Sequence, residues 1–359
     1  MSPLSLRQRI ALELDRIRRH NDAQLHPLYQ LFWECTLRCN LRCLHCGSDC
    51  KQESLTPDMP AADFLHAVDE VLPHVDPHKL MVIFSGGEPL VRKDIEEVGR
   101  ELNRRQMPWG MVSNGMLLTE ERLRSLLAAG MHSMTISLDG NATDHNWLRG
   151  NEHSHERALN AIRLLSRTNV KWDVVTCVNC RNINYLPQIK QILLEAGARA
   201  WRLFAIFPVG RARQYPDLQL PDADLRRLLD FIAAQRADAH NPMDVSFACE
   251  GFVGSYEGKV RDHLYECQAG ISVASVLIDG SISACTSIRS GFYQGNIYTD
   301  NLWDVWEHRF ERYRNRQWAH QDECSDCKMW RYCEGNGMHL HDEDGKLLTC
   351  HLKRIGEKD

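Results

Sequence analysis

Residues 34–46 read ECTLRCNLRCLHC and contain Cys39, Cys43 and Cys46, separated by three and then two residues. Cysteine thiolates are the usual ligands of iron–sulfur clusters, and a [4Fe–4S] cube has four irons to be held. Three thiolates bind three of these irons and leave the fourth one free. An open metal position is typical of catalytic sites, whereas fully closed coordination is typical of structural ones. The segment therefore predicts a reactive iron–sulfur site.

Short apolar runs alternate with longer amphipathic runs on the C-terminal side of residue 27. Six apolar runs predict strands at 28–34, 79–85, 108–113, 132–138, 172–178 and 201–207. Five runs with helical spacing lie between them, at 61–72, 95–105, 120–129, 154–166 and 186–196. Strands that alternate with helices form parallel sheets with crossover connections. Since a closed barrel needs eight strands, the sequence predicts an α/β fold with an open, partial (β/α)6 barrel.

The charge balance of the 359-residue chain is mixed, with a net charge of -5. No basic or acidic excess indicates a nucleic-acid partner or a membrane surface. Near the N-terminus, Leu6, Ile10, Leu14 and Ile17 recur at helical spacing among arginines. This pattern predicts an amphipathic helix within residues 1–27 that packs on the body, not a signal peptide. No apolar stretch reaches the length of a membrane span, so we expect a cytoplasmic protein.

Fourteen cysteines are many for a cytoplasmic chain, where disulfides are rare. Clustered spacing favours metal binding for most of them. Isolated cysteines are often small buried hydrophobes, and we interpret Cys177 and Cys180 in this way. Cys35 and Cys50 are interpreted as structural or as supports for the neighbouring ligands.

Small polar motifs follow the second, third and fourth predicted strands. They read SGGEP at 85–89, SNG at 113–115 and SLDG at 137–140, and Arg149 follows in the stretch 146–150. Each motif alone is an ordinary turn or loop, and a lone arginine is usually a solvated surface charge. Their order on successive strands is informative, because the carboxyl ends of parallel strands carry the active sites of such folds. Glycines let the backbone approach a ligand, and arginine can bind a carboxylate with two hydrogen bonds.

The cysteine spacing together with the GGEP motif resembles the radical S-adenosylmethionine (SAM) superfamily, over about residues 28 to 215. The resemblance implies that the open iron binds the amino and carboxylate groups of SAM. One electron then cleaves the sulfonium and gives a 5′-deoxyadenosyl radical, which abstracts a hydrogen atom from the substrate. By position, the resemblance also implies a set of SAM contacts: Gly86, Gly87, Glu88, Pro89, Ser113, Asn114, Ser137, Asp139 and Arg149.

A second group of cysteines lies in the C-terminal tail, at positions 267, 285, 324, 327, 333 and 350. The two-residue spacing between Cys324 and Cys327 is also typical of zinc sites. The whole pattern resembles the SPASM extension of radical SAM enzymes, which binds two auxiliary [4Fe–4S] clusters. The resemblance implies one closed cluster on Cys324, Cys327, Cys333 and Cys350, and an interior cluster on Cys267 and Cys285.

The interior cluster lacks an expected ligand, because the sequence has Gly337 where the SPASM pattern has a cysteine. Cys249 lies upstream and could supply one thiolate. Three outcomes stay open at this point: an iron that is open to substrate, a ligand other than cysteine such as His339, or loss of this cluster.

The resemblance divides the chain into an N-terminal helix (1–27), a radical SAM core (28–215), a bridging region (216–265) and a SPASM domain (266–359). It implies hydrogen abstraction from a peptide or protein substrate, giving an oxidative modification or a crosslink. An electron donor such as flavodoxin or ferredoxin is also implied. Because 27 residues are too few for a leader-binding domain, we expect either a separate recognition protein or direct recognition of a folded or membrane-anchored substrate.

Two other functions remain open from the sequence: a radical dehydrogenase of a small molecule, and a non-enzymatic iron–sulfur or zinc redox sensor. Sulfatase maturation is disfavoured, because Thr286 follows Cys285 where that branch has an aspartate. Tyr256, Glu257 and Asp262 lie in the bridging region, but nothing selects one of them as a general base.

Overall fold

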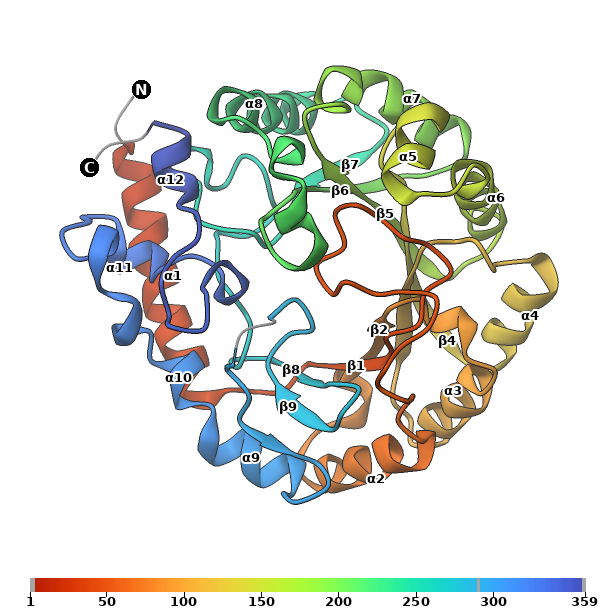
Figure 1. Ribbon diagram of the computed structural model, residues 1–359. Coiled ribbons are helices and arrows are strands. Elements are labelled where there is room, and N and C mark those ends of the chain that lie inside the picture. The colour runs from red at the N-terminus through yellow and green to blue at the C-terminus, as the bar shows by residue number, and fades with distance from the viewer. Residues whose placement is uncertain (1–3, 289–290, 357–359) are drawn as a thin grey trace.

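The computed structural model describes residues 4–288 and 291–356. Ten strands form one continuous sheet in the order β10-β9-β8-β1-β2-β3-β4-β5-β6-β7, which curves around the centre of the molecule (Figure 1). The predicted partial barrel is confirmed as β1 Gln30–Thr36, β2 Met81–Gly86, β3 Trp109–Ser113, β4 Met131–Ser137, β5 Lys171–Val178 and β6 Ala200–Ala205. These six strands pair in parallel with their neighbours, so their carboxyl ends share one edge of the sheet.

Two segments outside the predicted barrel extend this sheet at its edges. β7 (Asp244–Phe247) lies in the bridging region and pairs in parallel with β6. β8 (Val273–Val276) lies in the tail and pairs in parallel with β1, and β9 (Ser281–Ser283) and β10 (Gly295–Asn296) follow it as antiparallel strands. The barrel therefore stays open. Beyond β1, the sheet continues with strands of the cysteine-rich tail.

Helices cover the outside of the curved sheet (Figure 1). The five predicted helices are present as α2 Ala61–Val71, α3 Ile95–Arg104, α4 Glu120–Ala128, α6 Ser154–Leu165 and α7 Leu186–Glu195. The sequence did not predict α5 (Ala142–Arg149), a short polar helix that begins at the Asn141 cap and ends at Gly150. In the bridging region, α8 (Asp222–Ala237) adds a further outer helix.

Large aromatic side chains fill the layer between sheet and helices. Trp33 of β1 stacks on Phe64 of α2 with ring centroids 4.4 Å apart, and Phe84 of β2 stacks on Trp109 of β3 at 5.2 Å. All four side chains are fully buried. Successive side chains of a strand point to opposite faces of the sheet. Because these aromatic residues face the helices, the residues between them face the barrel interior.

The tail packs beside the β8 edge through short helices. Two of these helices, α9 (Leu302–Arg309) and α10 (Glu311–Arg314), follow each other and are separated by Phe310. Two single-turn helices, α11 (Trp330–Cys333) and α12 (His351–Arg354), each lie next to a cysteine of the tail. No helix in the described part of the chain is both long and apolar enough to cross a bilayer.

The N-terminal helix α1 (Leu6–Leu25) packs along the tail at the rim of the molecule, as Figure 1 shows. The helix predicted within residues 1–27 is present and packs on the body, but its apolar stripe does not face inward. Leu6, Ile10, Leu14 and Ile17 are exposed, whereas Arg19 is buried. Arginines on the polar side of α1 form ion pairs with Glu266 and Glu334 of the tail. These ion pairs determine which side of the helix faces inward.

Candidate active site

The cysteine loop begins directly after β1 and is held by backbone contacts from distant segments. Cys39 N donates to Lys51 O at 2.7 Å, and Leu44 N donates to Leu148 O of α5 at 2.8 Å. These contacts fix the loop at both ends, at the carboxyl edge of the sheet where the sequence placed it.

Arg211, which the sequence analysis did not single out, also holds this loop from the far side of the barrel. Its side chain is buried, and its guanidinium donates to Cys43 O at 2.6 Å and to Asp49 Oδ1 at 2.9 Å. Its backbone N–H donates to Cys46 O at 2.9 Å. Arg211 therefore fixes two of the three cysteine carbonyls, and no local sequence pattern indicates this role.

The thiols of the loop differ in how readily they ionise. A hydrogen bond from the Cys50 side chain lowers the pKa of Cys46 to about 6, whereas burial raises the pKa of Cys39 to about 12. The thiolate is the form that binds metal, and a bound metal ion stabilises it further. Cys46 is thus the more readily ionised of these two thiols, and Cys50 supports it. Three thiols on one short loop are a donor set that fits an iron–sulfur cluster.

One cavity of about 300 Å³ brings the three cysteines together with most of the predicted SAM contacts. Its walls include backbone and side chains from the ends of the first six strands and from the tail. The predicted residues among its lining are Cys39, Cys43, Cys46, Gly86, Gly87, Ser113, Asn114, Ser137 and Arg149. Cys177, interpreted as structural from the sequence, also lines this cavity, as do Phe204 and Phe207 after β6.

The two glycines of the GGEP motif lie directly against the cysteine loop. Gly86 has a φ of +123°, and a Cβ atom there would lie 2.2 Å from Thr36 O. A Cβ atom on Gly87 would lie 2.1 Å from Arg38 O. The loop can therefore approach the end of β2 only because these residues carry no side chain.

We expect Gly87→Ala to push Arg38, and with it Cys39, away from the cavity. The free energy of unfolding should fall by at least about 1–3 kcal/mol, the usual cost of overpacking, and the iron bound per chain should fall with it. Urea unfolding and iron analysis measure the two effects. Gly47→Ala is the matched control in the same loop, because a Cβ atom there meets nothing within 4 Å. Equal iron content in both variants would contradict this prediction.

Glu88 and Pro89 do not line this cavity but lie behind its wall. Glu88 is buried and accepts hydrogen bonds from Ser113 Oγ at 2.8 Å, Asn114 N at 2.7 Å and Leu90 N at 3.1 Å. Pro89 is buried in the turn Pro89–Val91. Burial raises the pKa of Glu88, and its three hydrogen bonds oppose this rise. The Glu88 carboxylate thus ties the end of β2 to the end of β3 and orients Ser113 and Asn114.

Asn114 connects the cavity wall with the cysteine loop. Its side-chain amide donates to Asn40 Oδ1 at 2.8 Å and approaches Cys39 Sγ at 3.8 Å. Asn40 was not predicted as a site residue, and only its position between two of the cysteines could have indicated it.

Asp139 lies behind Arg149 and forms a buried ion pair with it. Asp139 Oδ2 is 2.7 Å from Arg149 Nε, and Asp139 Oδ1 accepts from Cys177 N at 2.8 Å. Burial alone would raise the pKa of Asp139, but the Arg149 guanidinium holds it well below its usual range. Asp139 therefore orients Arg149, which lines the cavity, while Asp139 itself does not.

The four distal cysteines of the tail also gather around one cavity. Cys324, Cys327, Cys333 and Cys350 line a space of about 450 Å³ beside α11 and α12. Four thiols around one cavity are the donor set of a closed cluster.

Cys285, one of the two interior cysteines of the tail, lies close to the front cavity. The Cys249 thiol lies near the thiols of Cys285 and Cys267. Thr286 and Ser287, which directly follow Cys285, line the front cavity. Cys285 is thus a single residue away from the cavity wall.

A side chain has no room at position 337, where the expected cysteine is missing. A Cβ atom on Gly337 would lie 2.7 Å from His339 Cε1 and 3.0 Å from Glu250 O. The His339 ring packs on Phe207 of the front cavity, with centroids 4.7 Å apart. His339 therefore occupies the space between the missing ligand position and the cavity.

Family comparisons agree with this geometry. Residues 33–192 match the model of the radical SAM superfamily, and residues 267–328 match that of the SPASM iron–sulfur cluster-binding domain. The chain belongs to the radical SAM superfamily. As a radical SAM enzyme with a SPASM domain, it uses a [4Fe–4S] cluster and SAM, and its SPASM domain binds auxiliary iron–sulfur clusters. The non-enzymatic sensor is thereby set aside.

Relatives of this radical SAM chain act on different kinds of molecule. It is 28% identical over 319 residues to an AdoMet-dependent heme synthase of Methanosarcina barkeri, covering 84% of this chain and 89% of the relative. It is 29% identical over 322 residues to the mycofactocin maturase MftC of Mycolicibacterium smegmatis, covering 86% and 77%. In fold, it resembles native anSMEcpe with bound AdoMet and the Kp18Cys peptide. The TM-score is 0.73 at 18% identity, over 92% and 95% of the chains.

Proposed function

We propose that this radical SAM enzyme abstracts a hydrogen atom from a peptide or protein substrate and gives an oxidative modification or a crosslink. The observation that carries the proposal is the single front cavity, which collects three cysteine thiols, Arg149 and the small polar strand ends. When bound there, the cluster and SAM together supply a 5′-deoxyadenosyl radical.

In this proposal, Cys39, Cys43 and Cys46 hold the cluster, and the chain positions SAM around it. The backbone at Gly86 and Gly87 gives close access to the methionine amino group. Ser113, Asn114 and Ser137 offer hydroxyl and amide groups to the ribose and the amino acid. Arg149, fixed by Asp139, binds the carboxylate. Phe204 and Phe207 keep water from the reacting atoms, since a reactive radical must meet only its substrate.

The charge of the cavity lining favours a peptide side chain over a polycarboxylate macrocycle. Burial lowers the pKa of His45 to about 4, so Arg149 is the one cation at neutral pH among the described residues that line the cavity. This cation is already paired with Asp139.

The tail cysteines suit a net oxidation of this substrate. After loss of a hydrogen atom, an oxidised product requires loss of one further electron from the substrate. Two auxiliary clusters would carry this electron away from the substrate. Their ligands would be Cys285, next to the cavity wall, and the distal group Cys324, Cys327, Cys333 and Cys350. A flavodoxin or ferredoxin would supply the reducing electron at the front site, and a separate recognition protein would bring the peptide.

We expect the substrate class to be revealed by 5′-deoxyadenosine formation in a fractionated extract. Iron-loaded enzyme, SAM and dithionite are combined without oxygen, and ultrafiltration separates the extract into macromolecules and small molecules. The macromolecular fraction should raise 5′-deoxyadenosine formation, and protease treatment should remove the effect. Stimulation by the small-molecule fraction, or by added iron–coproporphyrin III, would instead establish a small-molecule substrate.

A further inference from the structure

The outward face of α1 is apolar and has no partner within the described chain. Its exposed leucines and isoleucines are Leu6 (75%), Ile10 (54%), Leu14 (64%), Ile17 (52%) and Leu25 (73%). Over all described residues, the other exposed leucines and isoleucines are Leu55 and Leu117 alone. Helices at a protein surface usually turn their apolar stripe toward the core. The reversed orientation of α1 is therefore a property of this helix and not of the surface in general.

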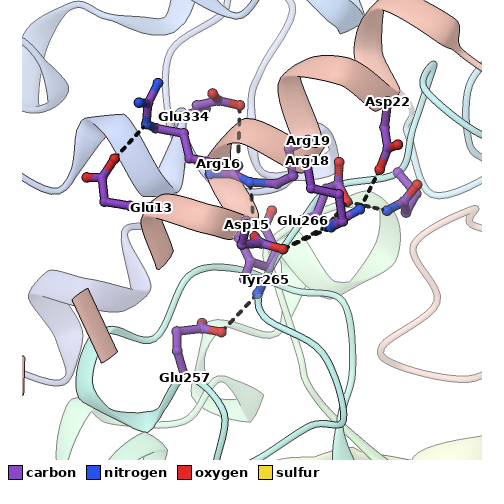
Figure 2. A network of polar contacts seen from close by, with 11 residues as sticks. Glu13, Asp15, Arg16, Arg18, Arg19, Asp22, Glu257, Tyr265, Glu266 and Glu334 are labelled. Atoms are coloured by element: carbon purple, nitrogen blue, oxygen red, sulfur yellow. Dashed lines mark hydrogen bonds and ion pairs between the residues drawn. The ribbon is translucent and has the colours of Figure 1, made fainter. Parts of the chain in front are cut away.

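The opposite face of α1 is fixed to the tail by charged and polar contacts. Arg18 Nη2 is 2.8 Å from Glu266 Oε2, and Tyr332 Oη donates to Glu13 Oε1 at 2.6 Å. The buried Arg19 lies between Asp15 on its own helix and Glu334 of the tail, at 3.3 and 3.4 Å. Figure 2 shows these charged side chains on the side of α1 that faces Glu266 and Glu334. With these contacts in place, the helix cannot turn its apolar stripe inward.

The charges left unpaired on α1 are positive. Its acidic residues Glu13, Asp15 and Asp22 each form an ion pair with an arginine. Arg7 and Arg9 form no ion pair within the described residues, and both are exposed. At about 100° per residue, Arg7 and Arg9 lie on the two opposite edges of the stripe formed by Leu6, Ile10, Leu14 and Ile17.

We propose that α1 binds in the plane of a lipid bilayer with anionic headgroups. An apolar stripe edged by arginines is the pattern of helices that lie in a membrane interface. The aliphatic side chains would enter the acyl boundary, and Arg7 and Arg9 would meet phosphate groups on either side. Binding of this kind needs no membrane-spanning segment and does not depend on which substrate the enzyme modifies.

A second copy of this chain fits the face of α1 less well. A helix of 20 residues is about 30 Å long and about 10 Å across, so its outward face is well below the about 800 Å² that each partner of a stable complex buries. A bilayer requires neither a minimum area nor a matching shape.

Vesicle flotation with the iron-loaded full-length enzyme tests this proposal. We expect the wild type to float with vesicles that contain phosphatidylglycerol and to bind pure phosphatidylcholine at least tenfold more weakly. The double variant Ile10→Glu/Leu14→Glu should lose at least tenfold in binding to the anionic vesicles. Arg7→Gln/Arg9→Gln should bind both vesicle types equally weakly. Leu55→Glu, which changes an exposed leucine outside α1, is the matched control and should bind as the wild type does.

The variants must keep their iron content and their 5′-deoxyadenosine formation, because α1 lies outside the front cavity. Absence of flotation with either vesicle type would overturn the proposal, and so would equal binding by the wild type and the Ile10→Glu/Leu14→Glu variant. Sedimentation equilibrium measures whether the enzyme self-associates in the absence of vesicles. Self-association that this double variant abolishes would assign the face to a second copy and reject the bilayer.

Discussion

Cys43→Ala should lower 5′-deoxyadenosine formation by more than about 100-fold, the upper end of the effect of losing an outer partner of a metal ligand. Cys43 is buried, lines the front cavity and has its carbonyl fixed by Arg211. In the proposed site, its loss leaves two thiolates for a cube that needs three. Bound iron should therefore fall by about four atoms per chain, the content of one [4Fe–4S] cluster. Anaerobic iron analysis and chromatography of the nucleoside product measure both effects.

Cys180→Ala is the matched control for the Cys43 variant. Cys180 is exposed, and its thiol donates to Asp217 O at 2.8 Å, away from the front cavity. We expect this variant to keep the iron content and activity of the wild type. If the Cys43→Ala enzyme kept all of its iron and continued to form 5′-deoxyadenosine, the reactive cluster could not be the one assigned to the front loop.

Arg149→Met should have two separable effects, one on stability and one on SAM binding. Asp139 would remain buried without its partner, which should lower the free energy of unfolding by about 3–5 kcal/mol. The SAM carboxylate would also lose a charge-assisted hydrogen bond of about 1.5–3 kcal/mol, so the dissociation constant for SAM should rise about 10- to 100-fold. Urea unfolding and equilibrium dialysis measure the two quantities.

A second substitution separates the two roles of Arg149. Adding Asp139→Asn to Arg149→Met removes the unpaired buried charge, so the double variant should recover much of the lost stability. It should not recover SAM affinity, because the guanidinium is still missing. Arg100→Met, an exposed arginine on α3, controls for the loss of an arginine as such. Recovery of both properties in the double variant would show that Arg149 only stabilises the fold.

The barrel could be predicted from the sequence because its physical signals are local. Strands of a parallel sheet are buried on both faces and appear as apolar runs, and the helices between them repeat at 3.6 residues. All six predicted strands are present, with shifts of one or two residues at most of their ends. Parallel pairing also explains why motifs that follow separate strands meet in one cavity, although the cofactor contacts proposed for them stay predictions.

The features that could not be predicted from the sequence depend mainly on contacts between distant segments. β7 and β8 are four residues each, and their pairing with β6 and β1 has no local signal. Glu88 was predicted to contact SAM; its place behind the cavity wall depends on Ser113 and Asn114 at the end of β3, in addition to Leu90 of its own turn. The periodicity of α1 defines an apolar face, yet charges more than 240 residues away decide where that face points. The domain boundaries and the cytoplasmic location remain predictions.

The contact between Arg211 and the cysteine loop has a consequence for how the enzyme matures. The loop leaves the ribosome early, and the guanidinium that fixes its carbonyls is made 168 residues after Cys43. A nascent chain that has not yet reached Arg211 carries all three thiols on a loop whose Cys43 and Cys46 carbonyls still lack these donors. We therefore expect the front site to reach its final shape only after the sixth strand has formed, so that a cluster delivered to it meets a nearly completed barrel.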